Sequence, residues 1–203
     1  SLSNKLLVLI DGRSVYSPMF GGVYWDMINA MPEDIDRIEV ISGPGAALWG
    51  ANAVNGVINI ITRNSADTQG GVLTLGAGNV ERDAAVQYGG RLSPDLTYRL
   101  HAEYSAFSAF PLANGGNAGD AWSKPTGGFR LDWTPGNDQV SLQGDLFTAD
   151  QNPGGFIRGQ DVATTWRHQF ANGSSLQLLA YYDDSERYLN NAGGFQVHTY
   201  DVE

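Results

Sequence analysis

The sequence contains no cysteine, and it holds only 12 lysines and arginines against 22 aspartates and glutamates. Without cysteine, the chain has no disulfide scaffold, no thiol nucleophile and no Cys-ligated zinc or iron–sulfur site. The formal net charge of −10 argues against a nucleic-acid partner, because phosphate binding draws on clustered Lys and Arg side chains. The longest unbroken apolar run, Leu6–Ile10, is far shorter than the ~18 residues that a transmembrane helix needs.

Sequence signatures of catalysis are also missing. His101, His168 and His198 stand alone in separate expected strands, so none has a second histidine at metal-binding spacing. No Gly-x-Ser-x-Gly or Walker-type loop occurs, and the Gly43–Gly45 turn lacks the third glycine of a dinucleotide-binding fingerprint. We therefore expect no enzyme, no metal site and no cofactor.

Neither end of the sequence has the character of a domain terminus. Ser1–Lys5 supplies neither the apolar core nor the cleavage site of a signal peptide, and Leu6–Ile10 has the pattern of a buried strand. At the other end, Phe195–Val202 alternates between apolar and polar residues and then stops, whereas domain termini are normally polar and frayed. We therefore expect the sequence to be a piece of a longer protein.

Glycine is abundant, with 26 of 203 residues, and residues 1–66 use it at abrupt chain reversals such as Asp11-Gly12. In the same region, Pro32-Glu33-Asp34 has the proline and the acids that open a short helix. Arg37–Ile41 alternates, and Val57–Thr62 is a β-branched strand. These short signals predict a small α+β unit.

Residues 67–203 alternate apolar and polar residues in segments separated by Gly, Asn, Pro and Asp clusters. Such segments with turn signals between them predict an antiparallel up-and-down meander, here of about eight strands. The expected strands lie near residues 72–78, 84–92, 98–105, 129–133, 140–146, 162–170, 176–182 and 195–202.

Two architectures produce this alternation. A soluble β-sandwich or small barrel turns the apolar face inward, whereas a transmembrane β-barrel turns it outward to lipid around a polar interior. Charges recur along the polar face, aromatic residues lie near strand ends, and the long 105–126 connection contrasts with tight turns at 93–95 and 172–173. These features favour the membrane barrel. A complete eight-stranded barrel would leave no room for residues 1–66, because side chains fill its interior.

Three ordered sequence blocks carry a family resemblance: Leu7–Arg13, Asp36–Pro44 and Trp49–Arg63. Together they closely resemble the C-terminal half of the plug of TonB-dependent outer-membrane receptors. The resemblance implies a mainly β fold, in which a partial plug precedes the first antiparallel strands of a large transmembrane barrel, incomplete in this sequence. The family usually has Arg where Ser42 precedes Gly-Pro, so we assign no plug–barrel ion pair to this position.

The resemblance also implies a function. It indicates an outer-membrane receptor of a Gram-negative bacterium that imports a scarce ligand, with a plug gating the barrel. A ferric siderophore is the first expectation, which makes the function iron transport, and haem or cobalamin are the alternatives. The implied partners are TonB, through a contact segment outside this sequence, outer-membrane lipid and the small-molecule ligand. The competing interpretation is a soluble β-sandwich that binds or adheres to a ligand through Gly-rich loops.

Two groups of residues in the plug-like region are candidates for function. The aromatic loop after Asp11-Gly12 and the Gly43–Asn52 turn correspond to plug apices that face incoming ligand in the family. The candidate ligand-binding residues are Tyr16, Phe20, Tyr24 and Trp49, with packing against the barrel wall as the alternative role. The candidates for plug–barrel ion pairing are Arg37, Glu39 and Arg63, with a solvated strand edge as the alternative.

Overall fold

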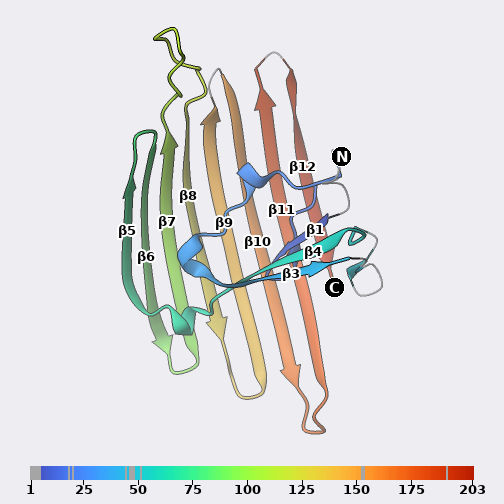
Figure 1. Cartoon of the computed structure of the whole chain (residues 1–203). Coiled ribbons are helices and arrows are strands. Elements are labelled where there is room, and N and C mark those ends of the chain that lie inside the picture. The colour runs from blue at the N-terminus through green and yellow to red at the C-terminus, as the bar shows by residue number, and fades with distance from the viewer. Residues whose placement is uncertain are drawn as a thin grey trace. The chain divides into compact units, whose positions relative to one another are not determined.

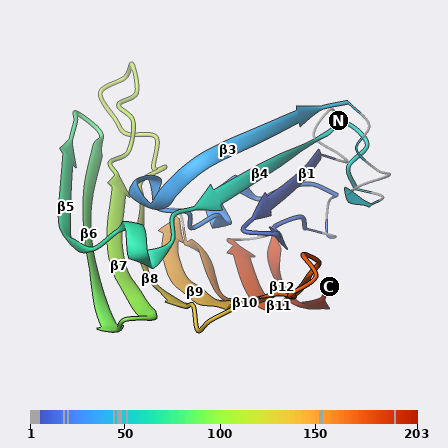
Figure 2. The ribbon, with the colours of Figure 1, turned by 90° about the horizontal axis from the view of Figure 1, so that it is seen from below.

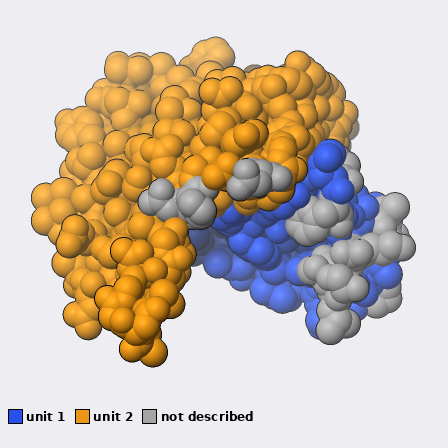
Figure 3. Space-filling model, turned by 90° about the horizontal axis from the view of Figure 1, so that it is seen from above, with its two compact units in different colours: residues 1–63 blue, residues 64–203 orange. Residues whose placement is uncertain are grey.

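The computed structural model describes residues 6–17, 19, 21–43, 45, 49–50, 52–151, 154–190 and 192–203. The chain divides into two compact units, residues 1–63 and residues 64–203, which Figure 3 colours separately. One β-sheet has four strands and belongs to the first unit, and the other has eight and belongs to the second. None of the helices in the described ranges has the length and apolarity needed to cross a membrane.

The first unit is built on a mixed sheet with the strand order β2-β1-β4-β3. The strand β1 (Leu6–Ile10) pairs in parallel with β4 (Gly56–Thr62) and antiparallel with the short β2 (Arg13–Ser14). The strand β3 (Ile35–Ser42) pairs antiparallel with β4 and is an edge of the sheet. Four of the five residues of β1 are buried, which explains why its sequence is an unbroken apolar run rather than an alternating one.

Short elements connect these strands. The 3₁₀ helices η1 (Trp25–Met27) and η2 (Pro32–Asp34) lie between β2 and β3, and η2 begins at the predicted proline. The turn between β1 and β2 has positive φ at both Asp11 (50°) and Gly12 (91°), a conformation that glycine adopts without steric cost. The described part of this unit is therefore the small mixture of strands and short helices that the sequence predicts.

The second unit is one antiparallel sheet whose strands follow one another in sequence order (Figure 1). The 3₁₀ helix η3 (Ser65–Asp67) precedes it. Its strands are β5 (Gly70–Ala77), β6 (Glu81–Ser93), β7 (Leu96–Phe107), β8 (Trp122–Trp133), β9 (Asp138–Gln151), β10 (Gly155–Gln169), β11 (Ser175–Leu189) and β12 (Gly193–Val202). The sheet is curved (Figure 2), but β5 and β12 form opposite edges. The structure thus confirms an antiparallel meander of eight strands in an unclosed barrel.

The two faces of this sheet have opposite polarity. Leu131 pairs with Leu142 on one face, whereas the preceding and following residues, Arg130 and Gln143, pair on the other. The side with the charges is the buried one: Arg130 is 8% exposed, whereas Leu100, on the apolar face, is 53% exposed. A soluble sandwich has the reverse arrangement, so the sheet has the polarity of a membrane barrel. Other exposed residues of the apolar face are Val86, Tyr88, Tyr104, Leu146, Val162, Trp166, Leu178, Tyr200 and Val202.

We predict that a new charge is tolerated on only one face of this sheet. Tyr200→Arg places a cation on the apolar face, where an arginine near the bilayer midplane costs about 2–4 kcal/mol. Thr199→Arg is the matched control, because Thr199 is the register partner of Asp183 on the polar face. Urea unfolding of the full-length protein in lipid bilayers should give the lower unfolding free energy for Tyr200→Arg. Equal losses in both variants would contradict the assignment of the faces.

Candidate functional site

The loop after β2 is folded back by its own backbone. The N–H of Gly21 donates to the carbonyl of Ser17 at 3.1 Å. A Cβ added to Gly21, which has a φ of 70°, would lie 3.1 Å from the hydroxyl oxygen of Tyr16, so the phenol lies against this turn. Tyr24 follows the turn and is the residue directly before η1, with no capping hydrogen bond from its side chain. The loop therefore keeps Tyr16 and Tyr24 on either side of one turn, while Phe20 lies outside the described residues.

Trp49 lies farther along the chain and is partly buried against the core of the first unit. The backbone N–H of Trp49 donates to the carbonyl of Gly45 at 2.9 Å. A Cβ added to Gly45 would lie 3.3 Å from Cδ1 of the indole, so the missing side chain lets the ring approach the backbone. The core cluster that Trp49 contacts consists of Leu7, Leu9, Ala53 and Val57. The sequence did not reveal this packing role, because a tryptophan in a Gly-rich turn has no periodic pattern around it.

Arg37 and Glu39 contact each other along the exposed edge strand β3. The Arg37 guanidinium donates from Nε to Glu39 Oε1 at 2.9 Å and from Nη1 to Asp36 Oδ2 at 2.8 Å. Asn59, on β4, donates from Nδ2 to Glu39 Oε2 at 3.2 Å. Arg63 is separate from this group at the end of β4, and its backbone N–H donates to the carbonyl of Asp34. The structure therefore pairs Arg37 and Glu39 with each other on β3, within the first unit.

These contacts shift the pKa values of both partners. The hydrogen bond from Arg37, and after it the one from Asn59, hold the pKa of the Glu39 carboxyl below its ordinary value. The hydrogen bond to Glu39, followed by that to Asp36, raises the pKa of Arg37. Because the folded pKa of Glu39 is lowered, the pair stabilises the fold above the ordinary carboxyl pKa. That contribution is lost as the pH falls through the lowered value.

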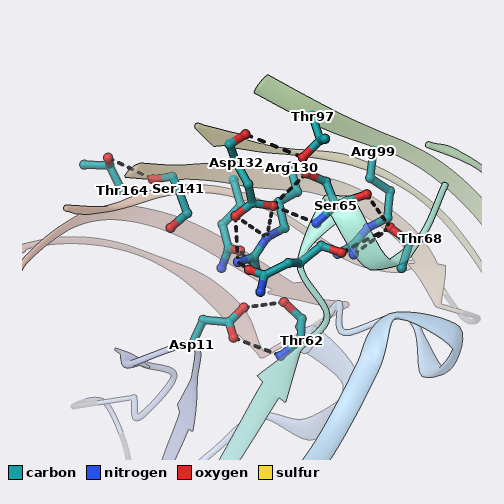
Figure 4. Close-up of polar contacts among 12 residues, drawn as sticks. Asp11, Thr62, Ser65, Thr68, Thr97, Arg99, Arg130, Asp132, Ser141 and Thr164 are labelled. Carbon is teal, nitrogen blue, oxygen red and sulfur yellow. Dashed lines mark hydrogen bonds and ion pairs between the residues drawn. The ribbon is translucent and has the colours of Figure 1, made fainter. Parts of the chain in front are cut away.

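A buried polar network lies at the start of the second unit (Figure 4). Asp132 Oδ2 on β8 accepts from the Ser65 N–H and from the Ser65 hydroxyl, both at 2.7 Å. It also accepts from Arg130 Nε at 2.9 Å. Ser65 is fully buried and Asp132 is 8% exposed. A buried carboxylate is costly without compensating donors. The donors from Ser65 supply that compensation, so these contacts hold η3 against β8.

Arg130 extends this network to both sides. Its Nη2 donates to Asn64 Oδ1 and its Nη1 donates to Gln143 Oε1 on β9, each at 3.0 Å. The hydroxyl of Thr97 on β7 lies 2.7 Å from that of Ser65. The alternation in the sequence places Arg130 on the polar face. No sequence pattern predicts that Ser65, far upstream, contacts the same face. The contact depends on the path of the chain after β4.

An acidic row, formed by Asp145, Asp161 and Asp183, crosses the polar face on β9, β10 and β11. His101 on β7 reaches the end of this row, with Nε2 3.0 Å from Asp145 Oδ1. Gly128 lies between them on β8, where a side chain would collide with Asp145 Oδ1 and the imidazole. Within the described ranges, no three His, Asp or Glu side chains are grouped so as to hold a metal ion.

Comparison with known proteins finds one family. Residues 1–57 match the family model of the TonB-dependent Receptor Plug Domain. The first unit therefore contains a plug domain of this kind, and the chain is similar to receptors for vitamin B12 and siderophores. It is 46% identical over 78 residues to the vitamin B12 transporter BtuB of Vibrio vulnificus (strain CMCP6), an alignment covering 38% of this chain and 12% of that protein. It is 38% identical over 77 residues to the ferric enterobactin receptor PirA of Pseudomonas aeruginosa, covering 34% of this chain and 10% of that receptor.

Solved TonB-dependent receptors have the same fold. The siderophore receptor PirA from Pseudomonas aeruginosa superposes with a TM-score of 0.72 at 20% identity, over 98% of this chain and 36% of that one. The ferripyoverdine receptor from the same organism gives a TM-score of 0.66 at 17% identity, over 95% of this chain and 31% of that one. The chain thus spans only part of the length of these receptors. The likeness confirms a plug-like unit followed by barrel strands.

We predict that Arg37 is the main cause of the lowered pKa of Glu39. Arg37→Gln removes the stronger hydrogen bond, so the pKa of Glu39 should rise toward its ordinary value. Asn59→Ala is the control and should produce a smaller rise, because its hydrogen bond contributes less. A carbon NMR titration of glutamate-labelled protein measures both shifts. An unchanged pKa in Arg37→Gln would show that the pairing on β3 does not persist in solution.

Proposed function

We propose that this chain is part of an outer-membrane receptor that imports a scarce small molecule with energy relayed by TonB. The observation that carries the proposal is the polarity of the second unit, which has charged residues buried and leucines exposed and follows a plug domain in the sequence. Such a sheet is stable where lipid covers its apolar face and polar groups fill its interior. In this role, the first unit is part of the plug and the second is part of the barrel wall.

Two ligand classes follow from the relatives. One relative is named as a vitamin B12 transporter, and others are named as ferric enterobactin and siderophore receptors. We infer that a ferric siderophore is the substrate, because relatives in sequence include two ferric enterobactin receptors and a rhizobactin receptor. Cobalamin is the alternative. Transport rather than catalysis is supported by these names, since all of them describe transporters or receptors.

We propose that Tyr16, Tyr24 and Trp49, together with Phe20, form the floor on which the ligand rests. The support is the folded-back loop that holds Tyr16 beside Gly21, because a shaped loop loses little conformational entropy when it binds. Trp49 packs on the core of the first unit, so its expected role is to set the position of the turn rather than to supply most of the contact area.

We also propose that Arg37, Glu39 and Arg63 carry reversible ion pairing between the plug and the barrel wall. The support is that Arg37 and Glu39 lie exposed on the edge strand β3, where they already form an ion pair. The Arg37→Gln variant tests this as well, because weaker pairing should admit more of a large antibiotic such as vancomycin through the full-length receptor. Arg37→Lys, which keeps the charge, is the control, and equal entry in all three proteins would contradict the role.

The proposed function predicts uptake in a Gram-negative host that lacks its own receptors. The full-length receptor should import radioactive iron bound to enterobactin, and this uptake should disappear when the host lacks TonB. Radiolabelled cyanocobalamin is the second probe and distinguishes the two ligand classes. Import that persists without TonB would contradict energy coupling, and import of neither compound would contradict both proposed substrates.

The ligand floor predicts a loss of affinity in the Tyr16→Ala/Tyr24→Ala double variant. Removing two aromatic rings that contact ligand should weaken binding of the imported compound at least tenfold, since each buried ring contributes about 1.5–3 kcal/mol. Trp25→Ala is the matched control, because Trp25 is 56% exposed and follows Tyr24 directly. Equilibrium binding to the purified full-length receptor measures the difference. Unchanged affinity in the double variant would assign the two tyrosines to packing.

A further inference from the structure

The two ends of the sheet in the second unit differ in their connections. The long connection between β7 and β8, residues 108–121, lies at one end, which Figure 1 shows at the top. The turns after β6, β8 and β10 are short and lie at the other end. Outer-membrane barrels have longer loops on the extracellular side and shorter turns on the periplasmic side. In the proposed function, the end with residues 108–121 is therefore the extracellular one.

Strand β11 shows where the apolar face of this sheet stops. Near the periplasmic end, this face begins with Leu176, the second residue of the strand. Toward the extracellular end, Tyr182 is followed on the same face by Asp184 and Glu186, because residues two apart in a strand share a face. The segment from Leu176 to Tyr182 spans about 20 Å at ~3.4 Å per residue, comparable with the ~25 Å apolar band of a membrane barrel. The strand thus continues beyond the part that hydrocarbon can cover.

The same change from apolar to polar residues occurs at the same level on the two neighbouring strands. Tyr182 pairs with Val162 on β10 and with Tyr200 on β12. In the next two rows toward the extracellular end, the register partners on all three strands are polar. We call these residues the polar band: Arg158, Gln160, Asp184, Glu186, Gln196 and His198. Because the polar band continues the apolar face, a lipid whose chains cover that face has its headgroup at the level of the band.

Asp184 organises the lower row of the polar band. Its Oδ1 accepts from Gln196 Nε2 at 2.9 Å, and its Oδ2 accepts from Gln160 Nε2 at 3.5 Å. His198 Nδ1 lies 3.3 Å from the same Oδ1. The carboxylate is therefore a positioning group that orients two amides and an imidazole from the neighbouring strands. The amide oxygens of Gln160 and Gln196 are not used in these contacts, so they can accept hydrogen bonds from a bound molecule.

Arg158 is oriented in the upper row, and its charge faces outward. The guanidinium contacts Glu186 Oε2 through both Nε and Nη2 at 2.6 Å. Its Cζ lies 5.5 Å from the centre of the Phe156 ring. The Arg158 side chain is nevertheless 62% exposed, and the Nη1 donors are not used in these contacts. A guanidinium held in one orientation with outward N–H groups is well suited to bind a phosphate.

We propose that the polar band binds the phosphorylated saccharide of lipopolysaccharide, the glycolipid of the outer leaflet. This proposal rests on the proposed function, which places the second unit in the wall of an outer-membrane barrel. The acyl chains cover the apolar face below Tyr182 and Tyr200, and Arg158 binds a phosphate of the headgroup. The amides of Gln160 and Gln196 bind sugar hydroxyls. A phospholipid offers the phosphate and the chains but no saccharide, so the two amides distinguish the two kinds of lipid.

Binding of deep-rough lipopolysaccharide to the purified full-length receptor tests the phosphate contact. Native mass spectrometry of the receptor in detergent measures the affinity, and Arg158→Gln should weaken it at least fivefold. Arg167→Gln is the matched control and should stay within twofold of the unchanged receptor. Arg167 also contacts its register partner on β11, Gln177, but it lies on the other face and near the periplasmic end. Equal affinities in the two variants would overturn the proposal.

A second variant separates phosphate binding from the ion pair on the sheet. Glu186→Gln breaks the pair but keeps the Arg158 charge, so the affinity for deep-rough lipopolysaccharide should stay within threefold of the unchanged receptor. A loss as large as that of Arg158→Gln would assign the effect to the broken pair and would overturn the proposal.

Phosphatidylglycerol, an anionic phospholipid, is the second probe and tests the saccharide contact. It should bind the unchanged receptor at least tenfold more weakly than deep-rough lipopolysaccharide. The Gln160→Leu/Gln196→Leu variant should reduce this preference at least threefold. Equal binding of the two lipids to the unchanged receptor would overturn the proposal. These measurements need neither TonB nor an imported compound, so absence of TonB-dependent uptake with the expected lipid preference would contradict the transport function and support the polar band.

Discussion

Inside a lipid bilayer, every backbone N–H and C=O must find its partner within the protein, and the pairing of strands in the second unit suits this constraint. Each strand from β6 to β11 is hydrogen-bonded to a neighbour on both sides, and β5 and β12 are the edges of the sheet. With the backbone satisfied by neighbouring strands, the side chains are free to differ between the two faces. The alternation of Leu131 and Arg130 is the result, and it suits the proposed role, in which one face meets lipid and the other a polar interior.

A polar interior also makes a buried carboxylate useful. Burial of the Asp132 carboxylate on the apolar face would be destabilising, because no donor would compensate its charge. On the polar face, the carboxylate accepts from Arg130 and from the N–H and hydroxyl of Ser65. The strand therefore offers a strong, directional contact at the place where the chain enters the sheet. A serine in a short 3₁₀ turn suffices as its partner, since the first N–H groups of such a turn have no partner within it.

The sequence predicted the parts of the fold that depend on local patterns. Period-two alternation located the strands near Leu100, Leu131 and Leu142, and the Asp11-Gly12 dipeptide located the turn after β1. The candidate site was harder, because its contacts join residues distant in the chain. Nothing local signals that Ser65 meets Asp132 or that Trp49 packs on β1 and β4, since both depend on how the chain returns after its turns.

The structure separates contacts that exchange easily from contacts that do not. Arg37 holds Glu39 at the surface, where an ion pair is screened by water, so Arg37 can exchange one carboxylate partner for another at little cost. Removing one partner from a buried pair such as Arg130 and Asp132 costs about 3–5 kcal/mol, because an uncompensated charge stays behind. The two kinds of contact lie in different units: the exchangeable pair is on the surface of the first unit, and the buried pair is on β8 of the second.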